Sequence, residues 1–184
     1  MTKLTVRALI ILVVISAICR VAGFAPQIAI ALFAGAIIPD KKWAVVIPVV
    51  SIFLSDCLYQ VLYDAGVLFM PGFYEGQWQN YIVFAALACI GFFIKKINVI
   101  NVLAGALAAN VVYFLASNFI VWAGWQGTRG LNRPQTWDGL MQCYTDALPF
   151  LRSNLISTLV FCTILFGGYS LLVTRKRVSA TTTS

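Results

Sequence analysis

One acidic residue inside an apolar stretch has the clearest chemical meaning in this sequence. Residues 43–63 read WAVVIPVVSIFLSDCLYQVLY and are long and apolar enough to cross a bilayer as one helix. Asp56 lies well inside this stretch, among several other polar side chains. An ionised carboxylate in hydrocarbon costs at least ~2.5–3.5 kcal/mol on insertion scales, so such residues usually face a cavity or a partner. The sequence therefore predicts that Asp56 forms part of one wall of a pocket.

Several other kinds of chemistry are excluded by what the sequence lacks. It contains no histidine, which removes histidine-based zinc sites and Ser–His nucleophilic pairs. Its five cysteines show no metal-binding spacing, and no G-x-x-x-x-G-K phosphate loop is present. Asp56 and Cys57 are adjacent, but neighbouring residues point ~100° apart on a helix. We expect a protein that is not an enzyme and has no cofactor or metal; a disulfide between Cys19 and Cys143 stays open.

The composition predicts the elements that position these residues. The chain is 61% hydrophobic and 10% charged, with a mean hydropathy of +0.90, which is typical of a polytopic membrane protein. We expect an all-α bundle of six transmembrane helices in a single domain, 1–184. The predicted spans are residues 5–19, 25–39, 43–63, 80–94, 97–123 and 151–174. Two loops, 64–79 and 124–150, are predicted to lie on the outer side.

The basic residues predict the orientation of this bundle. With alternating spans, nine of the 13 basic residues fall on one side: Lys3, Arg7, Lys41, Lys42, Lys95, Lys96, Arg175, Lys176 and Arg177. The other side receives Arg20, Arg129, Arg133 and Arg152. Because cytoplasmic loops carry an excess of Lys and Arg, both termini are predicted to be cytoplasmic.

This topology places many polar side chains in the outer leaflet. A cup open to the outside would have its ligand-binding residues there, and the candidates are Gln27, Asp56, Asn110, Asn118, Trp122, Tyr144, Arg152 and Asn154. The alternative is an interhelical hydrogen-bond cluster that only holds the bundle together, at perhaps ~0.6 kcal/mol per bond. Both interpretations stay open from the sequence.

The remaining patterns concern packing and loops. Small residues spaced four apart let membrane helices approach closely, and they occur as Ala31 with Gly35, Ala104 with Ala108, and Gly105 with Ala109. The apolar loop 64–79 is either a flap over a pocket or an interfacial hairpin. Residues 136–148 predict a short interfacial helix that stops at Pro149.

Three segments resemble a functionally uncharacterised family of small bacterial membrane proteins: residues 31–56, ASNFIVW at 116–122 and CYTDALPFLRSNL at 143–155. In layout, the chain is also similar to the substrate-binding (S) components of energy-coupling-factor (ECF) vitamin transporters. That second resemblance implies capture of a vitamin-type or micronutrient solute in an outward-facing pocket, with a separate transmembrane coupling subunit and two ATPases.

The function expected from these patterns is S-component-like solute capture in a bacterial cytoplasmic (inner) membrane. The alternative is a non-catalytic scaffold without a small-molecule ligand, since the rod-shape-determining MreD proteins are similar in size and layout. Membrane lipids are expected partners in both cases. Nucleic acid is not, because the net charge of +7 is placed at span ends and leaves no basic groove.

Overall fold

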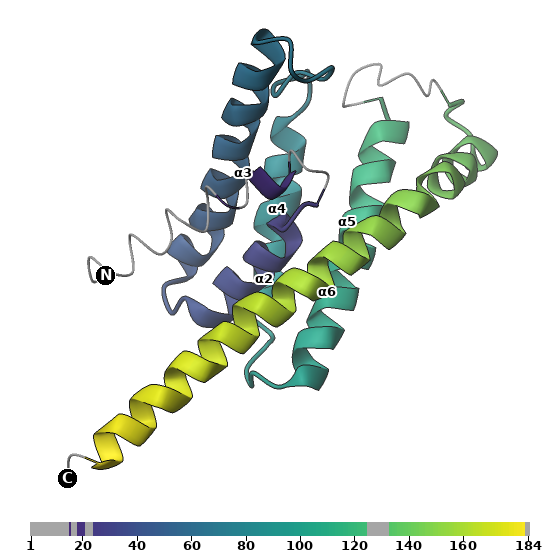
Figure 1. Cartoon of the computed structure of the whole chain (residues 1–184). Coiled ribbons are helices and arrows are strands. Elements are labelled where there is room, and N and C mark those ends of the chain that lie inside the picture. Colours follow the sequence, from purple (N-terminus) through teal and green to yellow (C-terminus); the bar gives the residue numbers. More distant parts are fainter. Residues whose placement is uncertain (1–14, 16–17, 21–23, 125–132, 183–184) are drawn as a thin grey trace.

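The computed structural model describes residues 15, 18–20, 24–124 and 133–182, with side chains described as far as residue 174. These residues form an all-helical structure (Figure 1). A helical turn at residues 18–20 precedes α2 (Gln27–Ile37), α3 (Lys41–Asp64), α4 (Trp78–Gly91), α5 (Val99–Trp122) and α6 (Trp137–Thr182). Most of the predicted first span, 5–19, lies outside the described residues.

Helix α2 lies at the centre of the bundle, in contact with α3, α4, α5 and α6. Its sequence is apolar on all sides, which is the pattern of a fully enclosed helix. Its closest neighbour is α4, where Gly35 and Gly91 face each other. A Cβ on Gly35 would overlap the carbonyl oxygen of Ala88 and lie 2.9 Å from the Cα of Gly91. The two backbones can touch only because both positions lack a side chain.

Three of the described helices are long and apolar enough to cross a membrane: α3, α5 and residues Trp137–Thr174 of α6. Helices α2 and α4, predicted as spans 25–39 and 80–94, have 11 and 14 residues. At ~1.5 Å per residue they are ~16 and ~21 Å long, which is shorter than a hydrocarbon core of about 30 Å. Burial explains the apolar sequence of α2 as well as a membrane span would, whereas α4 buries only five of its 14 residues.

The boundary predicted at Pro149 is wrong. Helix α6 begins at Trp137, and the Thr136 hydroxyl accepts a hydrogen bond from the Gly139 N–H at 3.2 Å. The helix then continues through Pro149 to Thr182. A proline removes one backbone hydrogen bond and usually bends a helix without ending it when both flanks are helical. Figure 1 shows the first turns of α6 lying at an angle to the long remainder, which crosses the bundle diagonally.

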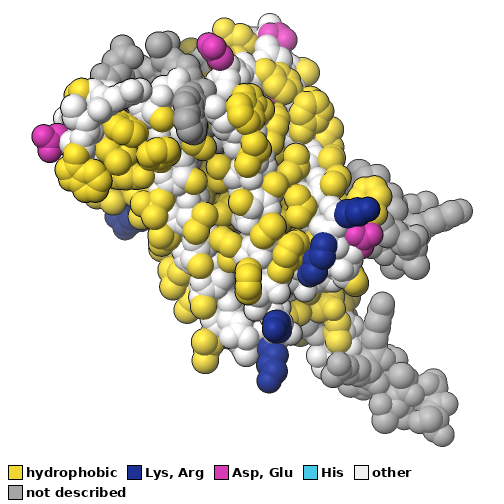
Figure 2. Space-filling view, turned by 180° about the vertical axis from the view of Figure 1, so that it is seen from behind, with side chains coloured by type: hydrophobic (Ala, Val, Ile, Leu, Met, Phe, Trp, Pro, Cys, Tyr) yellow, Lys and Arg dark blue, Asp and Glu magenta, His cyan; other side chains and the backbone are white. Residues whose placement is uncertain are grey.

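Apolar side chains cover much of the face drawn in Figure 2, and the charged residues on this face lie mostly near its margins. Lys41 and Lys42 begin α3, and Lys95 and Lys96 precede α5. Both pairs therefore lie at the same end of the bundle. The α3–α4 loop lies at the opposite end and carries Glu75. We call these the lysine end and the loop end.

Candidate functional site

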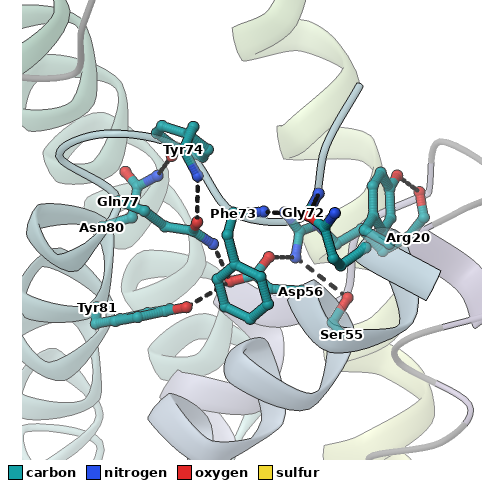
Figure 3. A network of polar contacts seen from close by, with 11 residues as sticks. Arg20, Ser55, Asp56, Gly72, Phe73, Tyr74, Gln77, Asn80 and Tyr81 are labelled. Atoms are coloured by element: carbon teal, nitrogen blue, oxygen red, sulfur yellow. Dashed lines mark hydrogen bonds and ion pairs between the residues drawn. The ribbon is translucent and has the colours of Figure 1, made fainter. Parts of the chain in front are cut away.

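Asp56 is the centre of a buried polar network near the loop end, drawn in Figure 3. Its side chain is only 1% exposed, and one oxygen accepts a hydrogen bond from Arg20, with which it forms an ion pair. The other oxygen accepts hydrogen bonds from the Gln77 amide and, at 2.9 Å, from the Tyr81 hydroxyl. Arg20 also donates to the Ser55 hydroxyl at 3.2 Å. We call these five residues the Asp56 cluster.

Arg20 is held in this cluster by α3. The guanidinium carbon lies 4.7 Å from the centre of the Tyr59 ring, a cation–π distance, and the Tyr59 hydroxyl donates to the Arg20 carbonyl at 2.8 Å. Ser55, Asp56 and Tyr59 lie within four residues of each other, so they occupy neighbouring positions on the helix surface. The segment before α2 is thereby attached to α3.

The loop between α3 and α4 lies directly against Asp56. The side-chain oxygen of Gln60 accepts hydrogen bonds from the backbone N–H groups of Gly72 and Phe73, at 3.1 and 3.3 Å. A Cβ on Gly72 would overlap the carbonyl oxygen of Asp56, so the backbones pack without space between them. This loop, predicted as a flap or an interfacial hairpin, covers the Asp56 cluster.

The carboxylate of Asp56 thus has its donors supplied by the protein itself. A carboxylate only accepts hydrogen bonds, and three donors together with one positive charge satisfy most of what it lost on burial. This arrangement agrees with the second interpretation of Asp56, in which it belongs to a hydrogen-bond cluster that holds the bundle together. The Asp56 side chain has almost no exposed surface to which a ligand could bind.

A second polar region lies on the other side of the α4 N-terminus, between α4, α5 and α6. It is a cavity of about 290 Å³ lined by Asn80, Tyr113, Phe114, Ser117, Asn118, Val121, Phe150, Leu151 and Asn154. We call it the asparagine cavity. It brings together two of the predicted ligand-binding residues, Asn118 and Asn154, from different helices.

The asparagine amides keep hydrogen-bonding capacity. The Asn118 amide nitrogen donates to the Phe114 carbonyl of its own helix at 2.7 Å, which leaves the side-chain oxygen able to accept. The Asn154 amide makes no hydrogen bond to another described residue and lines the cavity. The Asn80 side chain donates to the Tyr74 hydroxyl, so Asn80 links the cavity to the α3–α4 loop.

Three other predicted ligand-binding residues do not line this cavity. Trp122 donates from its ring nitrogen to the Pro134 carbonyl at 3.0 Å, and the Tyr144 hydroxyl donates to the Leu115 carbonyl at 3.2 Å. Both bonds fasten the start of α6 and the segment before it to α5. Arg152 is exposed on the outside of α6.

The last two predicted residues are buried in the bundle. The Asn110 amide donates to the Ala106 carbonyl at 2.8 Å, and its oxygen accepts from the Thr158 hydroxyl at 3.5 Å. Asn110 therefore links α5 to α6 at mid-length. Gln27 is 4% exposed, and neither side-chain atom has a hydrogen-bond partner in the part of the chain that the structure describes.

The small residues of α5 divide between two faces. Gly105 and Ala109 are buried, and a Cβ on Gly105 would come within 2.7 Å of the Ile94 side chain. Ala104 and Ala108 are exposed, so this second pair does not pack against another described helix. Of the two close-packing pairs predicted on α5, only Gly105 with Ala109 is buried among the described residues.

Sequence reasoning missed most of the Asp56 cluster. Gln77 and Tyr81 are four residues apart across the start of α4, a spacing that places both side chains on one helix face. That pattern could have been found. The pairing of Arg20 with Asp56 could not, because 36 residues separate them and only the tertiary fold joins them.

All five cysteines are free, so Cys19 and Cys143 do not form a disulfide. The described residues contain no group of three or more His, Cys, Asp or Glu side chains placed to hold a metal ion. The cavity lining offers amides, hydroxyls and aromatic rings, which bind neutral polar groups.

Together, the described residues form an all-helical structure in which three helices are long and apolar enough to cross a membrane and a polar, aromatic cavity lies between helices. The model of a family of unknown function, DUF6580, matches residues 1–181, and the chain belongs to that family. No curated protein and no solved structure matches the chain.

Proposed function

We propose that this protein captures a small, neutral, polar solute in the asparagine cavity, as a multi-pass protein of the bacterial cytoplasmic membrane. The observation that carries the proposal is the convergence of Asn118 and Asn154 from α5 and α6 on one cavity. Ligand pockets in proteins combine apolar and aromatic walls with a few polar groups that fix the orientation of the ligand. The asparagine cavity has this composition.

The chemistry of the lining limits the class of solute. None of the nine lining residues is charged, so a strongly ionic ligand would lose its hydration without a counter-charge. Amides both donate and accept hydrogen bonds, and they suit carbonyl, amide and ring-nitrogen groups. Tyr113, Phe114 and Phe150 offer aromatic surface for a planar ring. A heterocyclic, vitamin-type compound has these properties.

The charge distribution supports an outward position for the cavity. Two lysine pairs lie at the lysine end, and excess Lys in short loops favours the cytoplasmic side. The asparagine cavity adjoins the end of α5 and the start of α4, at the loop end. In the proposed arrangement of six spans with both termini cytoplasmic, solute enters from outside. The sequence carries no G-x-x-x-x-G-K phosphate loop, so in this proposal separate energising subunits, as in the ECF S components, supply the ATP hydrolysis.

Mass spectrometry on protein gently purified from its own host tests this proposal. We expect a stoichiometric small molecule that is lost, by at least about tenfold, from an Asn118→Leu/Asn154→Leu variant, since unpaired polar groups on the ligand are costly. Ser153→Leu is the matched control, because Ser153 is an exposed neighbour of Asn154 that does not line the cavity. Wild-type protein without any bound small molecule would contradict the proposal.

A scaffold function remains the second candidate because broad apolar faces are exposed. Within the 18-residue apolar segment of α5 that could cross a membrane, only 22% is buried inside the protein. Ala104 and Ala108 lie on the exposed side of this helix. Such a face suits close packing against a partner helix, as an MreD-like protein would need. Co-purification of another membrane protein without a small molecule, and its loss in an Ala104→Leu/Ala108→Leu variant, would favour this function.

A further inference from the structure

An apolar groove lies at the lysine end of the α5–α6 contact, away from the asparagine cavity. It has a volume of about 320 Å³ and runs between the first half of α5 and the middle of α6. Its walls include Val102, Ala106, Cys162, Phe166 and Gly167. Small side chains create the space, and a Cβ on Gly167 would meet no atom within 4 Å. We call this the α5–α6 groove.

One end of this groove is formed by the backbone that directly follows a pair of lysines. Its lining includes residues 97–99, which directly follow Lys95 and Lys96. The Lys96 carbonyl accepts hydrogen bonds from the Asn98 N–H at 3.1 Å and the Asn101 side chain at 3.0 Å, which fixes the backbone beside the groove. Both lysines are exposed, and neither forms an ion pair with a described acidic residue.

An apolar groove beside two lysines that form no ion pair with a described acidic residue suits an anionic phospholipid. Apolar groove walls exclude water around an acyl chain, and basic residues at a membrane surface attract anionic headgroups. The N-terminus of α5 adds positive partial charge at the same end. We propose that the α5–α6 groove binds an acyl chain of an anionic phospholipid while Lys95 and Lys96 bind its phosphate.

Native mass spectrometry tests this site directly. Purified full-length protein is incubated with equal amounts of phosphatidylglycerol and phosphatidylcholine that have identical acyl chains. We expect at least about tenfold more retained phosphatidylglycerol, because two lysines add favourable interactions with its net negative charge. Equal retention of the two lipids by the wild-type protein would overturn the proposal.

Two pairs of variants separate the headgroup from the acyl chain. Lys95→Gln/Lys96→Gln should reduce the preference to within about twofold, whereas Lys41→Gln/Lys42→Gln removes the same charge at the same end and should keep it. Gly167→Leu fills the groove and should lower retention of both lipids. Gly168→Leu adds the same side chain at a position that is equally open but does not line the groove, and it should change nothing. Identical behaviour within either pair would refute a lipid site at this place.

Discussion

The Asp56 cluster and the asparagine cavity lie on either side of the same turn of α4, yet they differ in how their polar groups are used. Gln77 and Tyr81 donate to a carboxylate that is already paired with Arg20. On the other side, Asn118 and Asn154 line an open volume and keep unused hydrogen-bonding capacity. A buried charge is so costly that the fold surrounds it with donors, whereas a neutral amide can be left available for a solute.

Removal of the carboxylate should have the largest effect. Asp56→Ala leaves the Arg20 charge and two hydrogen-bond donors without their acceptor, and we expect a loss of about 3 kcal/mol in the free energy of unfolding. Unfolding in detergent measures the loss. Glu75→Ala is the control, because Glu75 is an exposed acid at the same end, and it should change stability by less than about 0.5 kcal/mol.

A double variant tests whether the unpaired Arg20 charge causes this loss. An Arg20→Ala/Asp56→Ala double variant should be more stable than Asp56→Ala alone, because it leaves no unpaired charge. If Asp56→Ala instead kept its stability but lost a bound solute, Asp56 would belong to the ligand site, and the distinction between the two regions would fail.

The loop that covers Asp56 should respond to a single methyl group. Gly72→Ala places a Cβ against the Asp56 carbonyl and the Gln60 backbone, so the loop must move away from α3. We expect a loss of about 2 kcal/mol and faster cleavage of residues 65–77 by added protease, measured by limited proteolysis.

Gly66→Ala in the same loop provides the comparison. Gly66 has φ +73° but no atom within 4 Å of an added Cβ, so alanine there strains only its own backbone. We expect a cost of about 1 kcal/mol and no change in protease cleavage elsewhere in the loop. Equal cleavage in both variants would mean that the loop does not depend on its contact with α3.

The sequence predicts the all-helical fold and the positions of α3 and α5, because runs of more than 20 apolar residues have few other solutions. It could not separate a span from an enclosed helix at α2, since both environments select apolar side chains on every face. It also could not show that Asp56 is surrounded by donors from the protein whereas Asn118 lines a cavity. That difference depends on Arg20, Gln77 and the loop, whose positions are set by tertiary contacts.

A smaller effect tests whether the two regions are independent. Tyr81→Phe removes one of the hydrogen bonds to Asp56 and should lower stability by about 1 kcal/mol in the same unfolding measurement. Solute retention should not change, because Tyr81 does not line the asparagine cavity. Asn154→Ala removes a cavity-lining amide that makes no hydrogen bond to another described residue, so it should have the opposite pattern: reduced retention with a small change in stability.

The smallest effect is expected midway between the asparagine cavity and the α5–α6 groove. Thr158→Val removes the hydroxyl that donates to Asn110 at 3.5 Å while keeping the side-chain shape. Because interhelical hydrogen bonds inside membranes average about 0.6 kcal/mol and this one is long, we expect a loss of no more than that. Unfolding in detergent measures it against Thr174→Val, whose hydroxyl donates only within its own helix. A loss above about 2 kcal/mol would show that neutral polar groups also hold this bundle together, and the contrast between a structural carboxylate and available amides would then be too simple.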